Sequence, residues 1–342
     1  MITFNGKSAD EVWKKIVREM LDDNTNITDS RLGSTKEILH AGITFENPRD
    51  RWIFSRKPSL NPAFALAEVV WIVNGKSNAN FLNFWNSSLP NFAGNVKNYY
   101  GAYGSRLRDY NGIDQLERAY KALSNNSKTR QVVLQIWNPS KDLPFETGRP
   151  RSKDIPCNIC SIPKVRDNKL EWMQVLRSND IFLGVPYNFV QFTYLQEVLA
   201  GWLGIELGTY NQLSDSLHVY EKDFKNLLLS SEEFKKNPKI DSNLDSIAID
   251  KKNSEKLFNQ LESICNQLIF TKVTSKEVLE IIKWKNATES FRNILLIITS
   301  EFARRKGLDY LIEEILSNCS NPVLLFLWEN WYKRFKEQKI IT

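Results

Sequence analysis

The segment between Cys160 and Leu213 limits the possible folds of this chain more than any other part. Alternating apolar and polar residues predict two strands joined by a tight turn, and a long apolar helix and a third strand follow. These predicted elements are Cys160–Val165, Lys169–Ser178, Phe189–Leu203 and Thr209–Leu213. Because strands are combined with an apolar helix, the sequence predicts an α/β (α+β) fold in which helices pack against a mixed sheet.

Apolar spacing predicts further elements on both sides of this segment. The expected helices are Ser8–Asp22, Pro62–Asn74, Phe81–Trp85, Ile113–Leu123 and one starting in Leu217–Leu229, and the expected strands are Ile38–Asn47, Arg51–Ser55 and Arg130–Trp137. From about residue 230 the chain becomes rich in Lys, Ser, Asn and Glu, and only helical patterns follow. We therefore expect an α/β domain at residues 1–229 and an all-helical extension at residues 230–342.

Composition narrows the class of protein. The 342-residue chain is 42% hydrophobic and carries a formal net charge of +6, which is typical of a soluble globular protein and suits an anionic ligand. It has no basic run or nucleic-acid motif, so nucleic acid is not an expected partner. No apolar run is long enough for a membrane span and no secretory signal precedes the first helix, so we expect a cytoplasmic protein with reduced thiols.

Two of the four cysteines lie in the pattern Cys157-Asn158-Ile159-Cys160, which is found in redox pairs and in zinc sites. A zinc site needs two more ligands, and the other two cysteines, Cys265 and Cys319, are isolated in the helical extension. Metal binding and disulfide chemistry are therefore not expected.

Cys157 and Glu68 are candidate catalytic residues. A thiolate is the reactive form of cysteine, and a nearby cation such as Arg130 or Arg177 would lower the pKa of Cys157. The alternative is that Cys157 is a small buried apolar side chain. Glu68 stands among apolar residues of the predicted helix Pro62–Asn74. It either points to solvent or is a functional acid with a perturbed pKa.

Four other polar residues are candidate ligand contacts. The carboxamide of Asn188 can donate and accept at once, as recognition of a pyrimidine edge requires, although a loop asparagine is equally often a turn residue. His218 and Tyr220 would share a face at a strand end and could bind a hydroxyl; the alternative is a structural histidine at a helix start. Arg31 is either a phosphate contact or an ordinary solvated arginine.

Taken together, these residues resemble the thymidylate synthase family, which includes the deoxypyrimidylate hydroxymethylases. Pro156-Cys157 resembles the nucleophile motif of the family, and His218-x-Tyr220 resembles its sugar-binding pair. Its most specific signature is matched by Arg177-Ser178-x-Asp180-x-x-Leu183-Gly184-x-Pro186-Tyr187-Asn188. Upstream, Glu68-Val69-Val70-Trp71 resembles the helix that bears the active-site glutamate, and Tyr103-Gly104 also fits. The resemblance covers roughly residues 1–225, the expected catalytic domain, and not the tail.

The resemblance implies a folate-dependent transfer of one carbon. Cys157 would add to C6 of a pyrimidine nucleoside monophosphate, with dUMP as the first choice, and C5 would then take its carbon from 5,10-methylenetetrahydrofolate. The implied residues are, for catalysis, Cys157, Glu68, Tyr103 and Asn158; for the nucleotide, Arg31, Arg130, Arg177, Ser178, Asn188, His218 and Tyr220; and for the folate, Trp85, Asp180, Leu183 and Gly184. A homodimer is implied as well, with Arg130 reaching across it to the phosphate.

The chain also departs from the pattern of the family. Asn158 stands in place of a histidine, Ile162 of a glutamine, Gln131 of a phosphate-binding arginine, and Asp215-Ser216 of Gly-Asp. The short apolar C-terminus that closes over the folate is not recognisable. The resemblance implies a thymidylate synthase-like methyl transfer first. A loosened folate site would admit water, so the alternative is a hydroxymethylase of dUMP, dCMP or CMP that uses water instead of hydride in the last step. A non-catalytic nucleotide-binding or partner-binding protein on the same fold is the alternative of another class.

Overall fold

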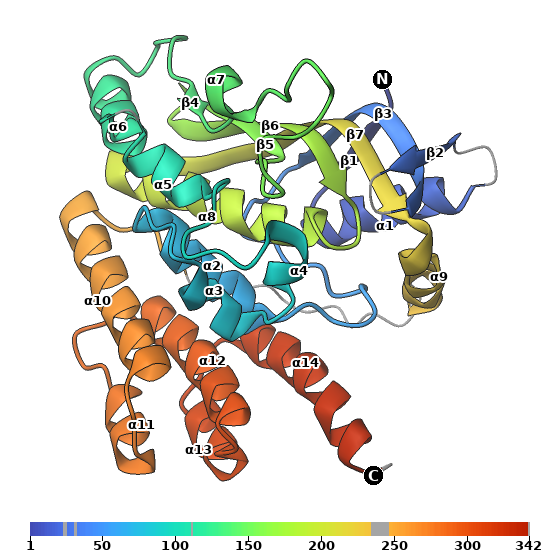
Figure 1. The fold of residues 1–342 in the computed structure, drawn as a ribbon. Helices are drawn as coiled ribbons and strands as arrows, with labels where there is room; N and C mark the ends of the chain where they lie inside the picture. The colour runs from blue at the N-terminus through green and yellow to red at the C-terminus, as the bar shows by residue number, and fades with distance from the viewer. Residues whose placement is uncertain (23–25, 31–32, 111, 234–245, 341–342) are drawn as a thin grey trace.

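A mixed sheet forms one side of the molecule (Figure 1). The computed structural model describes residues 1–22, 26–30, 33–110, 112–233 and 246–340. The sheet has seven strands in the order β1-β3-β7-β6-β5-β4, with β2 beside β3. The strands are β1 Thr3–Gly6, β2 Asn26–Ser30, β3 Gly33–Phe45, β4 Leu134–Gln135, β5 Asn158–Arg166, β6 Lys169–Asp180 and β7 Glu206–Tyr220. The β1–β3 and β6–β7 pairs are parallel and the other pairs are antiparallel, so the predicted mixed sheet is confirmed.

Helices cover the sheet and continue into the C-terminal part of the chain. Those that precede residue 234 are α1 Ala9–Leu21, α2 Pro62–Val73, α3 Ala79–Trp85, α4 Leu89–Ala93, α5 Tyr103–Arg108, α6 Gln115–Asn125, α7 Pro139–Asp142, α8 Val185–Leu203 and α9 Phe224–Glu233. The later ones are α10 Lys251–Phe270, α11 Ser275–Ile281, α12 Glu289–Arg305, α13 Ile312–Ser317 and α14 Pro322–Ile340. In the ranges given above, no helix is long and apolar enough to cross a membrane.

The first helix forms where its sequence signals predict. The hydroxyl of Ser8 caps α1 by accepting a hydrogen bond from the amide of Glu11 at 3.2 Å. Asp10, in the first turn, accepts hydrogen bonds from the amides of Phe54 and Ser55, both at 2.9 Å. These amides therefore bond to a side chain and not to a neighbouring strand. The predicted strand Arg51–Ser55 is wrong for this reason, because the segment is irregular.

The hairpin of β5 and β6 confirms the alternating pattern read from the sequence. Asp167 and Asn168 have φ values of 49° and 58°, the left-handed conformation that a two-residue hairpin turn needs. Aspartate and asparagine tolerate this conformation better than most residues, which explains their presence in the turn.

Two predictions in the sheet region are wrong. The expected helix starting at Leu217 begins only with α9, because β7 continues to Tyr220 between β3 and β6. Only Leu134–Gln135 of the expected strand Arg130–Trp137 pairs with β5. In both cases the neighbouring strands decide the length of the element, and the local sequence pattern does not encode them.

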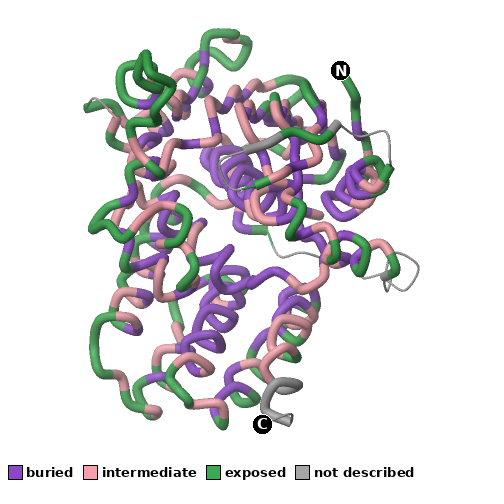
Figure 2. Tube along the Cα trace, turned by 45° about the vertical axis from the view of Figure 1, so that its right-hand side comes forward, coloured by how far each residue is buried: buried purple, intermediate pink, exposed green. Residues whose placement is uncertain are grey.

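Helix α2 lies at the centre of the helical layers. It packs against α8 on one side and against α12 on the other, so that every residue in it except Glu68 is buried. Figure 2 shows the buried residues concentrated on these central helices and the exposed residues at the periphery. The predicted helical tail is confirmed as a set of helices, and it lies on the side of α2 and α3 that faces away from the sheet (Figure 1).

One buried carboxylate connects the tail to the rest of the chain. Glu301 of α12 has no exposed surface and accepts hydrogen bonds from Arg304, Arg305 and, at 3.2 Å, the indole of Trp331 on α14. Arg305 also donates to the carbonyl of Trp85 at the end of α3, at 2.6 Å. The same arginine therefore joins α12 to the part of the chain that carries the sheet.

We predict that Glu301→Ala destabilises the protein by about 2–3 kcal/mol, because Arg304 and Arg305 lose a charged acceptor in a desolvated position. Denaturation by urea, followed by circular dichroism, measures the loss. Glu313→Ala on α13 is the control, since Glu313 is exposed and should change the stability little. Equal stability of the two variants would contradict the role given to Glu301.

Candidate active site

Cys157 precedes β5 and is held by Arg177 of β6. The amide of Arg177 donates to the carbonyl of Cys157 at 2.9 Å. Its guanidinium then donates from Nε to the carbonyl of Pro156 at 3.0 Å and from Nη2 to the carbonyl of Ile155 at 3.1 Å. Three consecutive carbonyls before the strand are therefore fixed by one residue. Nη1 of Arg177 makes no hydrogen bond to the residues that the structure describes and remains available to an anion.

A glycine supports the same segment from the other side. Gly101 donates its amide to the carboxylate of Asp154 at 2.8 Å. A Cβ atom at position 101 would lie 2.9 Å from the carbonyl oxygen of Asp154 and 3.2 Å from the nitrogen of Pro156. Only glycine allows this close approach, so the position of Cys157 also depends on the loop before α5.

Glu68 is the only residue of α2 that is not fully buried, and it faces α8. Its carboxylate accepts a hydrogen bond of 2.6 Å from Nε2 of Gln191. Burial raises the pKa of Glu68 to about 7, against the opposing effect of the Gln191 hydrogen bond. A carboxyl group with such a pKa can both take up and release a proton near neutral pH.

Tyr103 begins α5, within reach of the charges of Cys157 and Glu68. Burial raises the pKa of its phenol far above the usual value, and the charges of the Cys157 thiolate and of Glu68 act in the same direction. Gly104 makes this placement possible, because a Cβ atom there would lie 2.7 Å from the carbonyl of Ile72 in α2. Tyr103 therefore stays protonated and serves as a hydrogen-bond donor or acceptor.

Two amide groups in this region have an unused polar atom. Asn158 is fully buried and its Oδ1 accepts from Nε2 of Gln174 at 2.9 Å. Within the described residues, its Nδ2 has no partner, and neither has Oε1 of Gln191. An acceptor therefore remains unsatisfied on Gln191 beside Glu68, and a donor on Asn158, whose side chain acts on the phenol of Tyr103. A ligand or water that bonded to either atom would relieve the cost of burying it.

The end of β6 places several of the predicted residues next to each other. Ser178 pairs with Ser216, and Asp180 pairs with His218 on the parallel strand β7. The ring of His218 stands edge-on to that of Tyr220, with 5.3 Å between the ring centroids. The expectation that His218 and Tyr220 share a strand face is confirmed, because β7 does not end before them.

Asp180 begins the turn that leads into α8. Its Oδ1 accepts hydrogen bonds from the amides of Phe182 at 2.7 Å and Leu183 at 2.9 Å. Its Oδ2 is buried and has no partner among the described residues, and burial raises the pKa of this carboxyl group. A carboxylate oxygen in this condition suits a ligand with an N–H group. Gly184 caps the N-terminus of α8, which places Asn188 in the first turns of the helix.

Two predicted residues lie apart from this group, and a third cannot be placed. Trp85 is fully buried, and the structure shows its carbonyl against Arg305 of the tail, so its ring is not exposed to a ligand in this conformation. Arg130 is exposed at the surface. Arg31 lies outside the described residues.

Sequence reasoning missed Gln191, Asn179 and the glycine Gly101. Gln191 donates to Glu68, and Asn179 accepts from Asn188. Both are almost fully buried, at 5% and 2% exposure. The signal for Gln191 was a polar side chain inside a long apolar helix, the same signal that selected Glu68. For Gly101 the closeness of Asp154 is a tertiary contact that no local pattern contains.

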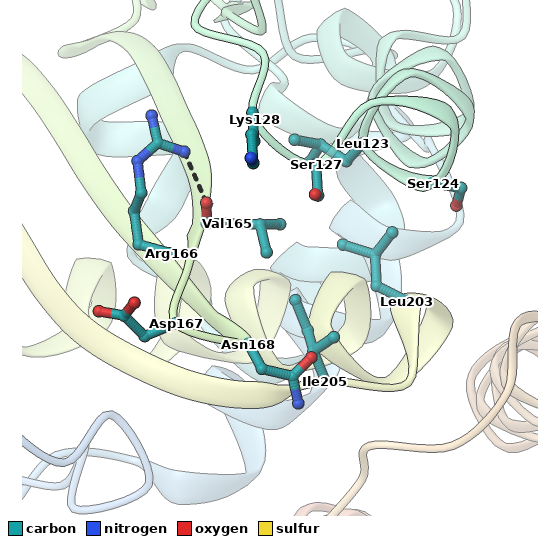
Figure 3. Close-up of a pocket in the computed structure, with 10 residues that line it drawn as sticks. All are labelled: Leu123, Ser124, Ser127, Lys128, Val165, Arg166, Asp167, Asn168, Leu203 and Ile205. Atoms are coloured by element: carbon teal, nitrogen blue, oxygen red, sulfur yellow. Dashed lines mark hydrogen bonds between the residues drawn. The ribbon is translucent and has the colours of Figure 1, made fainter.

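A separate cavity of about 420 Å³ lies at the other end of β5 from Cys157 (Figure 3). Its walls include the apolar side chains of Val165, Leu203 and Ile205, and Figure 3 shows Arg166 bonded to the carbonyl of Val165. None of the candidate residues lines this cavity. We place the functional site at Cys157, because reactive groups and unsatisfied polar atoms meet there. No group of side chains that could hold a metal ion is found in the described ranges.

Comparison with known proteins identifies the family of this chain. A family model described as "Thymidylate synthase" matches residues 11–264. A deoxyuridylate hydroxymethyltransferase of Bacillus phage SP01 is 34% identical over 235 residues, which are 66% of this chain and 60% of the relative. One of Pseudomonas phage M6 is 33% identical over 51% of this chain and 49% of the relative. A thymidylate synthase of Francisella tularensis is 28% identical over 58% of this chain and 76% of the relative. The chain therefore spans about half to three fifths of the two phage proteins.

We predict that Glu68→Gln stabilises the protein at high pH. The folded pKa of Glu68, about 7, lies above its ordinary value of 4.5, so the folded state binds this proton more tightly than the unfolded state. The stability that protonation provides is complete below pH 4.5 and is lost as the pH rises through 7. Above that pH the uncharged glutamine avoids burying a charge, and we expect a gain of about 1–3 kcal/mol.

Urea denaturation between pH 4.5 and 8 tests this expectation, with the stability difference between variant and wild type growing as the pH rises. Glu313→Gln is the matched control at an exposed position. A pH-independent difference for Glu68→Gln would show that Glu68 titrates alike in the folded and unfolded states.

Proposed function

This chain belongs to the thymidylate synthase family, and on that premise we propose that it transfers one carbon to C5 of a pyrimidine nucleoside monophosphate, dUMP, through a covalent adduct of Cys157. The observation that carries the proposal is the fixed position of Cys157. Arg177 bonds to its carbonyl and to the two carbonyls before it, and the charges of Cys157 and Glu68 both act on Tyr103. A fold alone does not require a thiol, an acid of raised pKa and an anion-binding arginine in one place.

Cys157 acts first in the proposed reaction. Its thiolate forms a bond to C6 of the pyrimidine, and the electron pair of the C5–C6 double bond moves toward C5 and the C4 carbonyl. C5 thereby becomes nucleophilic and can form a bond to an electrophilic carbon. Loss of the proton from C5 then lets the bond between the transferred carbon and its carrier nitrogen break, and the nitrogen takes up a proton. Water adds to the exposed carbon, and the electron pair that returns to C5 expels the sulfur of Cys157 and restores the C5–C6 double bond.

Glu68 and Tyr103 handle the protons during these reaction steps. A pKa of about 7 lets Glu68 accept a proton in one step and return it in another at neutral pH. Tyr103 keeps its proton because its own pKa is raised by burial, and it can therefore donate a hydrogen bond to a developing negative charge. Gln191 keeps the carboxylate of Glu68 in place through the bond of 2.6 Å.

The nucleotide would lie along the end of β6. Asn188 reads the base, and His218 and Tyr220 bind the sugar hydroxyl from the neighbouring strand. Arg177 and Ser178 contact the phosphate, with Arg31 as a further phosphate ligand and Arg130 reaching the site from the partner subunit. The net charge of +6 is consistent with a dianionic ligand.

We propose 5,10-methylenetetrahydrofolate as the source of the carbon. When bound, it supplies a one-carbon unit at the oxidation level of formaldehyde. The residues present fit such a ligand, because Oδ2 of Asp180 is a buried acceptor that lacks a partner among the described residues and can bind an N–H of the pterin ring. Leu183 and Gly184 follow on the same turn, whereas Trp85 would contribute only from within the core.

The last step is proposed to use water, which gives a hydroxymethyl product. The unsatisfied Oε1 of Gln191, whose Nε2 bonds to Glu68, is suited to accept a hydrogen bond from a water molecule. The names of the two phage relatives favour the same outcome. In that reaction the oxygen of water enters the product and no electrons are transferred, so tetrahydrofolate is released. A methyl product, as the name of the Francisella relative indicates, would require two electrons and a proton from the folate and would release dihydrofolate.

We propose that two chains pair through the uncovered face of the sheet. Trp172 and Gln174 point to the packed side and have almost no exposure, whereas Met173 between them is 38% exposed. Met173 pairs with Ile162 on β5, so apolar side chains stand together on the face that no helix of the described chain covers. Burying such a face against a second copy is the common way to complete a sheet of this kind.

The first prediction from this proposal concerns Cys157. With dUMP labelled with tritium at C5 and methylenetetrahydrofolate, the wild type should release tritium and Cys157→Ser should reduce the rate by at least about a thousandfold, because an alcohol is a far weaker nucleophile than a thiolate. Cys160→Ser, three residues away, is the control and should remain active. Mass spectrometry of the product separates hydroxymethyl from methyl. Release by Cys157→Ser at the wild-type rate would refute the covalent mechanism.

The second prediction concerns Arg130 and the dimer. Arg130→Ala and Cys157→Ser should each be inactive alone, but a mixture of the two chains should recover activity. If Arg130 acts across the dimer, each mixed dimer has one site with both residues intact, so that about a quarter of all sites would be active in an equal mixture. If mixed dimers are shown to form but activity does not recover, Arg130 does not act across the dimer. It then belongs to the active site of its own chain or to no active site.

A further inference from the structure

A chain of buried polar side chains leads from Asn188 into the core. Nδ2 of Asn188 donates to Oδ1 of Asn179 at 3.0 Å, and Nδ2 of Asn179 donates to Oγ of Ser214 at 3.2 Å. Asn188 is 7% exposed, and the other two residues are nearly or fully buried. Asn179 follows Ser178 on β6, and Ser214 lies on the neighbouring strand β7. The only candidate base reader of this site is therefore tied to the sheet through Asn179.

The connection continues along the packed face of β7. Nε2 of Gln212 donates to Oγ of Ser214 at 3.2 Å, and the hydroxyl of Tyr210 donates to Oε1 of Gln212 at 3.0 Å. Residues 210, 212 and 214 alternate along the strand, so they share one face, and each is almost completely buried. Water cannot replace these bonds readily, which makes the arrangement of the whole chain costly to change.

We propose that Asn179 is a positioning residue that fixes the orientation of the Asn188 amide and thereby sets a preference for uracil over cytosine. This inference rests on the proposed function, because it assumes that Asn188 faces a pyrimidine base. Asn179 itself does not contact the base and acts only through Asn188.

The reasoning follows from the two ends of an amide group. With Nδ2 of Asn188 bonded to Asn179, its Oδ1 accepts no hydrogen bond from the described part of the chain and can accept one from the ligand. The second hydrogen on Nδ2 can be donated beside it. Uracil offers an N–H donor at N3 and an acceptor at O4, which matches this order, whereas cytosine offers an acceptor at N3 and a donor at N4.

A rotation of Asn188 by half a turn would suit cytosine but would place its Oδ1 against Oδ1 of Asn179. Two acceptors would then face each other in a buried position, unless Asn179 and the hydroxyl of Ser214 also rearranged. The orientation of Asn188 is thus coupled to Asn179. A leucine at position 179 would remove the acceptor and leave Asn188 able to rotate toward either base.

The test measures equilibrium binding of dUMP and of dCMP by calorimetry, with the full-length protein and no folate. We expect the wild type to prefer dUMP and Asn179→Leu to lower the ratio of the two affinities by about tenfold or more. Asn179→Asp keeps an acceptor toward Asn188 and should retain most of the ratio. A general loss of packing would weaken both nucleotides together and would leave the ratio unchanged.

Asn293→Leu is the matched control. Asn293 of α12 is 1% exposed and donates to Oγ of Ser320 at 3.1 Å. The substitution to leucine therefore removes a comparable buried amide–serine bond in the tail. The ratio of the dUMP and dCMP affinities of Asn293→Leu should equal that of the wild type. If Asn179→Leu binds with the wild-type ratio, the positioning role is overturned. If Asn179→Leu does not fold, the same measurement with Ser214→Ala, which removes the support of Asn179, decides: a lowered ratio supports the role and an unchanged ratio overturns it.

The proposed function fails in a different way from this inference. A wild type that binds neither nucleotide would overturn both. A wild type that prefers dUMP and loses tritium release with Cys157→Ser, while Asn179→Leu leaves the preference intact, would uphold the proposed function and overturn only the role of Asn179.

Discussion

The hydrogen bonds of Arg177 are the interaction on which the rest of the site depends. Its backbone amide continues the pairing of β5 and β6 as far as Cys157, and its guanidinium holds the two carbonyls before that residue. The thiol is thus placed at a strand end and not in a mobile loop, although the peptide groups before it lack strand partners. Gly101 completes the support, because the opposite loop can approach Asp154 only in the absence of a side chain.

The second constraint is the burial of Glu68 between two apolar helices. The carboxylate of Glu68 faces α8, where it bonds to Gln191, and desolvation there raises its pKa to about 7. This burial costs stability above neutral pH, which a purely structural helix would avoid with an apolar residue. The cost is typical of functional sites, where a group is kept in an unfavourable protonation environment because the reaction needs it.

Hydrogen-bonded side chains beneath the site form two separate sets. One set joins Asn158 to Gln174, and the other joins Asn188 to Asn179 and Ser214. Each set is buried, and each ends at a group that faces the proposed ligand. In both cases a residue proposed to contact the ligand is hydrogen-bonded to a buried residue for which no ligand contact is proposed.

The sequence by itself determined the elements whose signals lie in residues adjacent along the chain. It also determined which candidate reactive groups are present. The cap at Ser8, the apolar periodicity of α2 and the tail helices, the turn at Asp167 and the ordered motif from Arg177 to Asn188 are all local signals, and the structure has elements where they predict them. The extent of β7, the failure of the strand at Arg51–Ser55 and the burial of Trp85 depend on partners distant in the chain. Gln191 and Asn179 belong to this second group as well, because a buried hydrogen bond between side chains of different elements exists only once those elements have packed together.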